Sequence, residues 1–547
     1  MPDYTGELTK AVSSGSVDLK DIWSNGGMML LCSLGNIVAA IICSLFLSKF
    51  ANNLANTLRV EIYDKVSSFS SKEMDSFSIA SLITRTTNDV AQVQMFYSLG
   101  LQILIKAPIL AIWAICKISV SSFEWTTAVI VAVSVIVVVV GLVVGIVLPK
   151  FKKIQKLIDN LNEVTRENIT GVRVIRAFNA EDYQENKFEK ANKNLTQNQL
   201  FTQRTIGFLM PTLSLIMNGL TLAIYWIGAV LINNASSIPE RLNKIGDMTI
   251  FTQYSLQIVM SFIMLIAVFI ILPRALVSAK RINEVLDTKP SIVDGEIESQ
   301  DDKGEIVFDN VSFSYNHDGK YVLKDISFEA HKGETVSIIG ATGSGKSTML
   351  HLLNRFYDVD KGQIVVDGVN VKDYKLTTLR KKIAYISQKT RLFSGNIKEN
   401  VAYGDNNIDE AKVEKSLKLA EANFVFDLED GINSLVAQGG TNFSGGQKQR
   451  LSIARAMYKD AEIIVFDDSF SALDYKTDMT IRKNLKKVFK DKIVIIVAQR
   501  IGTIKNSDKI IVLEQGKVVG LGKHQDLLDN CQIYKDIALS QLDKEEL

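Results

Sequence analysis

A glycine-rich segment with a single lysine, GATGSGKST, runs from Gly340 to Thr348. Its spacing matches G-x-x-x-x-G-K-[ST], and it lies between the β-branched run VSIIG and the apolar run MLHLLNRF, as a loop between a strand and a helix would. Backbone N–H groups of such a loop surround phosphate oxygens at the positive end of the helix. We expect Lys346 to reach the terminal phosphates and Ser347 to hold magnesium. The residues expected to bind ATP in this loop are Gly340, Ala341, Thr342, Gly343, Ser344, Gly345, Lys346, Ser347 and Thr348.

Two adjacent aspartates, Asp467 and Asp468, end the apolar run IIVF. In phosphate-loop ATPases an aspartate at the end of such a strand holds the magnesium shell, so we assign that role to Asp467. A strand-end cap is the alternative, which the phosphate loop disfavours. Asp468 is the candidate base for hydrolysis, and the length of its side chain therefore matters.

The composition indicates that part of the chain lies in a membrane. Of the 547 residues, 47% are hydrophobic, and the mean hydropathy is above zero, which is high for a water-soluble protein. The net charge of +2 does not suggest a nucleic-acid partner. Neither disulfides nor zinc sites are expected, because no C-x-x-C pair and no histidine at ligand spacing accompany the four cysteines, Cys32, Cys43, Cys116 and Cys531. The N-terminal segment does not have the pattern of a cleavable signal peptide.

Five apolar segments are long enough to cross about 30 Å of hydrocarbon as helices. They lie near residues 27–48, 100–120, 125–148, 206–232 and 249–272 and contain no aspartate or glutamate. Lysine and arginine gather in segments 49–99 and 149–205, which places both in the cytoplasm. The N-terminus is then outside, and everything after about residue 273 is inside. Lys106 and Lys117 are expected to snorkel to the membrane surface, with substrate contact as the alternative.

The residue pattern changes at about residue 304, where short β-branched runs begin to alternate with runs of helical periodicity. This pattern predicts an α/β domain with a partly parallel sheet. We therefore expect a multidomain protein, with an all-α transmembrane domain over residues 1–285, a linker over 286–303 and an α/β phosphate-loop domain over 304–547. The cytoplasmic segments alternate apolar and charged residues at helical spacing, so the spans should continue as helices well beyond the bilayer.

Several motifs, taken together and in order, resemble the ATP-binding cassette (ABC) transporters, in the exporter branch that fuses membrane and nucleotide-binding domains in one chain. FSGGQKQR, from Phe443 to Arg450, resembles the family signature with phenylalanine in place of the usual leucine. Tyr315 resembles the aromatic residue that stacks on adenine, and Gln388 the glutamine that senses magnesium and touches the membrane domain. SALD, residues 471–474, resembles the loop that crosses between two cassettes.

The resemblance covers essentially the whole chain and implies a type IV exporter-like fold in the plasma membrane, surrounded by lipid, with a cytoplasmic nucleotide-binding domain. It implies that magnesium is held by Ser347, Gln388 and Asp467. The signature residues implied to close over ATP held by a partner cassette are Ser444, Gly445, Gly446 and Gln447. Segments 72–90 and 167–183 resemble the intracellular loops whose short helices dock on cassettes, and solvated charged helices are their alternative reading.

The chain departs from the family pattern at the hydrolytic centre. The position of Asp468 normally carries glutamate, and that of Gln499, in IVAQR, normally carries histidine. Aspartate is one methylene shorter, and a misplacement of about 1 Å can cost about a hundredfold in rate. An amide cannot carry the charge of an imidazolium. Gln438 also replaces an acidic residue expected before the signature. These changes predict a site that holds ATP and hydrolyses it slowly.

The signature itself is nearly intact, and in a cassette dimer it serves the opposite site. We therefore predict a heterodimer, in which a second half-transporter carries glutamate and histidine at the positions of Asp468 and Gln499. This chain would then supply the Walker motifs of the slow site and the signature of the fast one.

The topology and the cargo leave alternatives open. Half-transporters of the family usually have six spans, and PDYTGELTKAVSSG resembles the outer end of a first span followed by an external loop, so a first helix is expected to be missing. Neutral polar and aromatic groups in the spans suit amphipathic or drug-like cargo. The alternatives are a lipid or peptide exporter subunit, a regulatory ATP-binding subunit with little turnover, and a remnant unable to transport.

Overall fold

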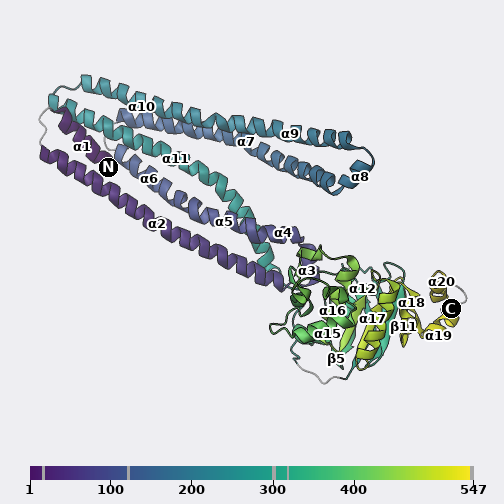
Figure 1. Ribbon diagram of the computed structural model, residues 1–547. Helices are drawn as coiled ribbons and strands as arrows, with labels where there is room; N and C mark the ends of the chain where they lie inside the picture. Colours follow the sequence, from purple (N-terminus) through teal and green to yellow (C-terminus); the bar gives the residue numbers. More distant parts are fainter. Residues whose placement is uncertain (15–18, 120–122, 299–302, 317–318, 542–547) are drawn as a thin grey trace. The chain divides into compact units, whose positions relative to one another are not determined.

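The computed structural model describes residues 1–547 except 15–18, 120–122, 299–302, 317–318 and 542–547 (Figure 1). The chain forms two compact units. The first, here called the helical unit, comprises Met1–Asp64 and Leu82–Asp287, and the second, here called the cassette unit, comprises Lys65–Ser81 and Thr288–Leu547. The finer domain boundaries expected at residues 285 and 303 remain a prediction.

The helical unit consists of long helices joined by short helical segments. Its α-helices are α1 (Pro2–Ser13), α2 (Leu19–Ser67), α4 (Ile79–Thr84), α5 (Val90–Met95), α6 (Leu101–Ser119), α7 (Phe123–Thr170), α8 (Val172–Ala177), α9 (Glu181–Gly207), α10 (Leu209–Asn233) and α11 (Ile238–Asp287). Two π-helical turns, η1 (Arg85–Asp89) and η2 (Phe96–Gly100), interrupt the path from α4 to α6. Short α8 lies at the tip of the hairpin formed by α7 and α9 (Figure 1).

The five expected membrane spans correspond in order to five long helical segments. Within the described residues, the segments long and apolar enough to span a membrane are Leu19–Ser67, Ile79–Ile118, Phe123–Thr170, Glu181–Asn233 and Ile238–Asp287. Helices α2, α7 and α11 have 49, 48 and 50 residues. Each is therefore about 70 Å long, more than twice the hydrocarbon thickness. These lengths are compatible with helices that continue beyond the bilayer, and the cytoplasmic location of the extensions stays a prediction.

An aromatic cluster packs the interior of the helical unit. The Trp125 indole donates from Nε1 to the carbonyl oxygen of Ile224 at 3.1 Å, and its ring lies 4.8 Å from that of Phe251, centroid to centroid. All three residues are buried. The indole therefore combines a large apolar contact with a satisfied N–H group, the usual arrangement of a buried tryptophan.

The N-terminal segment forms helix α1, which packs against α11. A Cβ atom placed on Gly6 would lie 2.4 Å from the Ile250 side chain, so a larger residue there would require Ile250 to move. The Asp3 carboxylate accepts hydrogen bonds from Lys117 Nζ at 2.8 Å and from the Tyr254 hydroxyl at 3.0 Å. Lys117, expected to snorkel, thus has a carboxylate partner within the chain.

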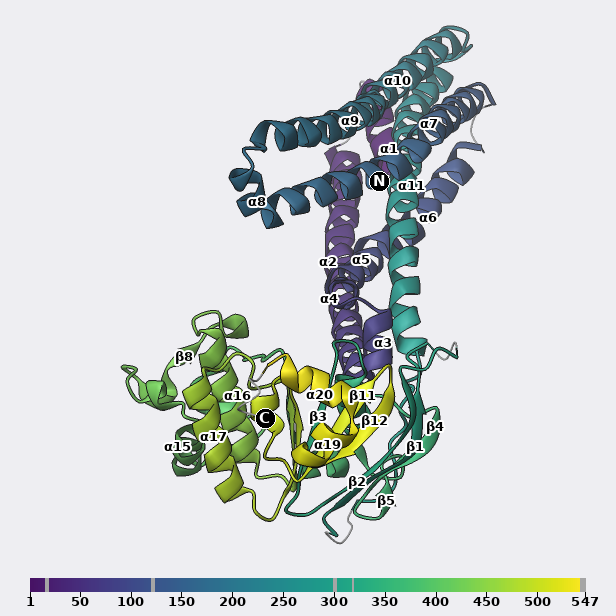
Figure 2. The ribbon, with the colours of Figure 1, turned by 90° about the vertical axis from the view of Figure 1, so that its right-hand side faces the viewer.

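The cassette unit contains a six-stranded sheet with the order β12-β11-β3-β10-β9-β6 and a four-stranded sheet with the order β2-β1-β4-β5. Strands β3, β11 and β12 of the first sheet and the strands of the second are labelled in Figure 2. The six-stranded sheet is parallel from β11 to β6, and β12 pairs antiparallel to β11. Its strands are β3 (Thr335–Gly340), β6 (Ile383–Ile386), β9 (Ile463–Asp467), β10 (Ile493–Val497), β11 (Lys509–Glu514) and β12 (Lys517–Gly522). This confirms the expected α/β domain with a partly parallel sheet.

The six-stranded sheet has a hydrophobic core on each face, one shared mainly with helices and the other shared with the four-stranded sheet. The remaining strands are β1 (Glu305–Phe313), β2 (Leu323–His331), β4 (Lys361–Val366), β5 (Val369–Asn370), β7 (Gly395–Asn396) and β8 (Leu435–Val436). The α-helices are α3 (Ser71–Ser76), α12 (Lys346–Leu353), α13 (Leu376–Lys382), α14 (Ile397–Val401), α15 (Glu410–Leu419), α16 (Gly445–Lys459), α17 (Tyr475–Val488), α18 (Ile501–Ile504), α19 (His524–Asn530) and α20 (Gln532–Leu539).

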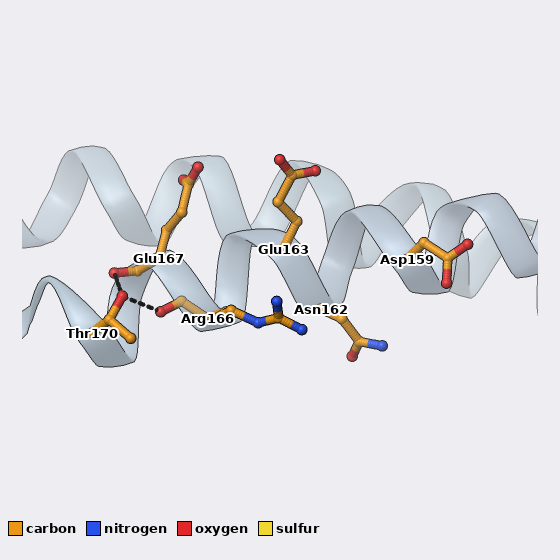
Figure 3. A pocket seen from close by; sticks show the side chains of 6 residues that line it. All are labelled: Asp159, Asn162, Glu163, Arg166, Glu167 and Thr170. Carbon is orange, nitrogen blue, oxygen red and sulfur yellow. Dashed lines mark hydrogen bonds between the residues drawn. The ribbon is translucent and has the colours of Figure 1, made fainter. Parts of the chain in front are cut away.

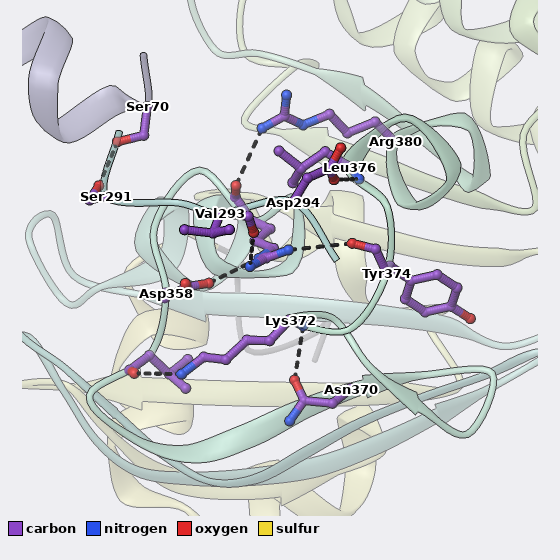
Figure 4. A network of polar contacts seen from close by, with 12 residues as sticks. Ser70, Ser291, Val293, Asp294, Asp358, Asn370, Lys372, Tyr374, Leu376 and Arg380 are labelled. Carbon is purple, nitrogen blue, oxygen red and sulfur yellow. Dashed lines mark hydrogen bonds and ion pairs between the residues drawn. The ribbon is translucent and has the colours of Figure 1, made fainter. Parts of the chain in front are cut away.

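Part of the segment expected to be a linker is fixed to the cassette unit (Figure 4). The buried Arg355 guanidinium donates to the carbonyl oxygens of Val293 at 2.8 Å and Tyr374 at 3.4 Å and pairs with Asp358 at 3.0 Å. Asp294 accepts from the backbone N–H of Leu376. The chain entering the cassette is therefore held by hydrogen bonds over these residues.

Candidate nucleotide site

The phosphate loop connects β3 to α12 at the carboxyl edge of the six-stranded sheet, where open α/β sheets bind ligands. Gly345 caps α12 with φ of +104°, a conformation that favours glycine. The Lys346 ammonium folds over the loop and donates to the carbonyl oxygens of Gly340 and Ala341 at 2.8 Å each. Burial lowers the pKa of Lys346, while the charges of Asp468 and Asp467 oppose that shift. The loop thus has the form expected for an anion site.

One buried hydroxyl in the loop has no partner within the described residues. Ser344 is 4% exposed, and its Oγ atom makes no hydrogen bond there. An unpaired buried donor costs free energy, which a phosphate oxygen accepting from it would recover. This vacancy in the hydrogen bonding fits a phosphate ligand.

Asp467 ends β9 beside the loop. Its Oδ1 atom accepts from the Ser347 hydroxyl at 2.9 Å, and its Oδ2 atom accepts from the Tyr385 hydroxyl at 2.9 Å. Burial and the nearby Asp467 charge raise the pKa of Tyr385, so its hydroxyl stays a donor. A serine hydroxyl and a carboxylate oxygen are suitable ligands for magnesium, so the two residues assigned to that ion fit it.

Asp468 lies in a cluster with two glutamines. Its Oδ2 atom accepts from Gln388 Nε2 at 3.2 Å and from Gln499 Nε2 at 2.9 Å. Its backbone has φ of +48°, in the left-handed region that aspartate adopts more readily than most residues. Burial raises the pKa of the Asp468 carboxyl, and the hydrogen bond from Gln388 opposes that shift. The three residues singled out from the sequence therefore meet at one carboxylate.

Replacing Asp468 with asparagine is expected to stabilise the protein at neutral pH. The folded-state pKa of Asp468 lies above its ordinary value of 3.8, so the ionised group costs stability above that folded pKa. The amide oxygen of asparagine can still accept from both glutamines. We expect the unfolding temperature to rise by about 2 °C at pH 7, with the gain shrinking as pH falls towards 3.8, as measured by differential scanning fluorimetry.

Asp405→Asn is the matched control, with the opposite sign. The pKa of Asp405 is lowered by hydrogen bonds from the Asn407 backbone and the Tyr458 side chain, so its carboxylate contributes stability at neutral pH that is lost on acidification. A lower unfolding temperature for Asp468→Asn at pH 7 would contradict the account of Asp468.

Tyr315 stands beside the helix that follows the loop. Its hydroxyl lies 3.1 Å from Thr348 Oγ1, and its ring meets that of Tyr357 edge to face, with centroids 5.1 Å apart. It is 37% exposed, so part of the ring faces solvent. This placement is compatible with an aromatic platform for adenine.

The signature residues cap helix α16. The Ser444 side chain accepts from the Gln447 backbone N–H at 3.3 Å, and the Gln447 side chain accepts from the Ser444 backbone N–H at 2.8 Å. Ser444 and Gly445 are exposed at the positive end of this 15-residue helix. Among the described residues, no hydrogen bond joins Ser444 to Gln447 with the phosphate loop of the same chain. An exposed helix end of this kind is free to meet another cassette.

The sequence did not indicate two hydrogen bonds that tyrosine hydroxyls donate to aspartates within the cassette unit. One is the bond from Tyr385 to Asp467. The other is a bond of 2.9 Å from the Tyr357 hydroxyl to Asp75 Oδ2 in α3, and Glu73 of α3 accepts from the Ser291 backbone N–H at 3.3 Å. The first predicted docking loop thus contacts its own chain's cassette, whereas docking of α8 stays a prediction.

A polar hollow of about 530 Å³ lies along α7, and none of the residues of the nucleotide-binding motifs lines it (Figure 3). Its lining residues are Asp159, Asn162, Glu163, Arg166, Glu167 and Thr170. The side chains carry both signs of charge, and Glu167 pairs with Lys187 of α9. We assign it no chemistry, because its lining residues are the exposed side chains of one face of α7.

The described part of the chain forms five membrane-length helical segments, followed by a cassette with a phosphate loop and an exposed signature helix. This combination defines an exporter half-transporter with fused membrane and nucleotide-binding domains. Such a chain binds ATP, works as part of a dimer and is an ATP-driven exporter subunit in the membrane, with its nucleotide-binding domain in the cytoplasm.

Comparison with known proteins agrees with this class, and the chain belongs to the ABC transporter family. Residues 1–262 match the family described as ABC transporter transmembrane region, and residues 323–471 match the family described as ABC transporter. The fold is similar to a solved structure described as a bacterial Atm1-family ABC exporter with ATP bound. The TM-score is 0.81 at 24% identity, and the match covers 100% of this chain and 95% of that one.

Three relatives illustrate the sequence similarity. An uncharacterized ABC transporter ATP-binding protein of Mycobacterium tuberculosis (strain ATCC 25618 / H37Rv) is 35% identical over 94% of this chain and 87% of that protein. YfiB, another of Bacillus subtilis (strain 168), is 32% identical over 98% and 93%. An ATP-dependent lipid A-core flippase of Pseudomonas fluorescens (strain Pf0-1) is 31% identical over 91% and 82%.

Proposed function

We propose that this chain is the slow-site subunit of a heterodimeric exporter. The observation that carries the proposal is the pairing of Asp468 with Gln499 at 2.9 Å. The short Asp468 carboxylate accepts a hydrogen bond from the Gln499 amide. A glutamate carboxylate and a histidine imidazole at these two positions would serve hydrolysis. Gln388 donates to the same oxygen. Two amide donors therefore occupy Oδ2, which disfavours its use as an acceptor for an attacking water.

The rest of the site is fitted to hold nucleotide. We propose that residues 340–348 bind the phosphates, with Lys346 as the cation, and that the Tyr315 ring stacks on adenine. Ser347, Asp467 and Gln388 would hold magnesium, although Gln388 bonds Asp468 in this structure. Magnesium, when bound, neutralises phosphate charge. Ser444, Gly445, Gly446 and Gln447 would contact ATP on the partner cassette.

The proposed cargo is an amphipathic, drug-like compound. The expected spans contain no acidic side chain that could fix a cationic substrate, and polar groups within them are mostly neutral. Similarity to lipid A-core flippases favours a lipid as the second candidate. In both cases the neutral polar groups would meet a molecule that has polar and apolar parts.

Mixing two chains tests the heterodimer. We expect this chain alone to show little ATPase activity, and the mixture with a half-transporter that carries glutamate and histidine at the two positions to turn over at least about tenfold faster. The measurement is steady-state phosphate release from detergent-solubilised protein. Equal turnover by this chain alone and by the mixture would refute the proposal, and no turnover in any mixture would favour a regulatory subunit.

A further inference from the structure

We infer that Tyr385 is a positioning residue that fixes the orientation of the Asp467 carboxylate for magnesium, an inference that rests on the magnesium-binding role proposed for Asp467. Tyr385 in β6 pairs with Val465 in β9, and Asp467 lies two residues further along β9. Because side chains alternate along a strand, Tyr385 and Asp467 stand on the same face of the sheet. The hydroxyl donates to Asp467 Oδ2 at 2.9 Å.

The two oxygens of Asp467 have different donors. Oδ1 accepts from Ser347, whose hydroxyl oxygen is itself proposed to ligate magnesium, so the geometry of this bond would change when the ion binds. The bond from Tyr385 to Oδ2 uses no proposed ligand and would remain. Tyr385 is therefore the side chain that can keep the carboxylate plane fixed in both states of the site.

The Tyr385 ring is held in place by its neighbours. It meets the Phe356 ring edge to face at 5.9 Å and lies 6.4 Å from the His351 ring of α12, centroid to centroid. Helix α12 also carries Ser347. The hydroxyl is thus positioned by the same helix that supplies a proposed magnesium ligand, which links the two halves of the site.

A purely structural reading is that Tyr385 only satisfies a buried hydroxyl. Tyrosine hydroxyls commonly find a partner when buried, and loss of such a bond would lower stability alone. A residue that orients a metal ligand has a further effect, because removing it commonly weakens metal affinity by about 10- to 100-fold. The two readings differ in the magnesium dependence of nucleotide binding.

Tyr385→Phe removes one oxygen atom and tests the inference in the full-length chain. The probe is a fluorescent ATP analogue, titrated first in EDTA and then at rising magnesium concentration. We expect the Kd in EDTA to stay within about twofold and the half-saturating magnesium concentration to rise about tenfold. If Tyr385→Phe does not fold, Tyr385→Leu removes the same hydroxyl and is expected to give the same shift.

Tyr374→Phe is the matched control. Tyr374 is fully buried and donates to the carbonyl oxygen of Val366 at 3.0 Å, so the control loses a comparable bond without touching Asp467. An equal magnesium dependence in Tyr385→Phe and Tyr374→Phe would overturn the inference and leave the proposed function standing. If the unaltered chain binds the nucleotide equally with and without magnesium, the role of Asp467 fails and the inference fails with it.

Discussion

An Asp468→Glu, Gln499→His double variant is expected to hydrolyse ATP about a hundredfold faster at its own site than the unaltered chain. The added methylene moves the carboxylate outward by about 1 Å, a displacement that can be worth about a hundredfold in rate. Histidine removes the amide that now donates to Asp468 Oδ2 at 2.9 Å. It also brings an imidazole that can carry positive charge near a transferring phosphoryl group.

The measurement must isolate the site of this chain. The partner's catalytic glutamate is replaced by glutamine in the assembled transporter, so that steady-state phosphate release comes from the site with Asp468. Each single variant should recover only part of the rate. In Asp468→Glu, Gln499 still holds the lengthened side chain, and in Gln499→His the carboxylate stays short.

Asp491→Glu with Gln532→His is the control for the same two chemical changes. Both residues are exposed, and Gln532 bonds only Asp536 among the contacts described for it. The control should leave the rate unchanged. The slow-site assignment fails if the unaltered site already turns over as fast as the double variant.

The same change should cost stability. Asp468 has φ of +48°, and a left-handed backbone costs an ordinary L-residue about 1–2 kcal/mol. Aspartate tolerates it better than glutamate because its short side chain can form local hydrogen bonds. The double variant is therefore expected to unfold a few degrees below the unaltered chain while hydrolysing faster.

The predictable parts of the fold are those that depend on residues adjacent in the sequence. Apolar runs of about 20 residues determine the spans whatever surrounds them, since a bilayer requires that length. The phosphate loop is recognisable because its glycines, lysine and flanking strand and helix are adjacent in sequence. Asp467 follows from its position at the end of an apolar strand.

Contacts between distant segments were not predictable. Tyr385 in a strand reads as an ordinary core residue, and only the register between β6 and β9 places it beside Asp467. The hydrogen bond from Lys117 to Asp3 joins residues 114 positions apart. The left-handed backbone of Asp468 could not be predicted from its sequence neighbours either. Its N–H donates to Val497 O at 3.0 Å, a bond between segments that are distant in the sequence.

Ser444→Asp is expected to abolish turnover of a two-chain transporter, with a loss of at least about a hundredfold. If the signature closes over the partner's ATP, the new carboxylate would face phosphate oxygens. Two like charges about 4 Å apart repel by about 4 kcal/mol at an effective dielectric constant of 20. Aspartate remains a good N-cap residue, so α16 should keep the cap that Ser444 provides in this structure.

Asn396→Asp provides the matched control, because Asn396 also caps a helix, α14, through its side chain and forms a capping box with Glu399. Both variants place aspartate at a helix N-cap in the same cassette, and only one lies in the signature. Full turnover with Ser444→Asp would show that this signature serves no active site. A signature acts only on nucleotide held by the opposite cassette. If turnover is lost in Ser444→Asp but kept in Asn396→Asp and in Asp468→Asn, hydrolysis therefore happens on the partner's Walker motifs.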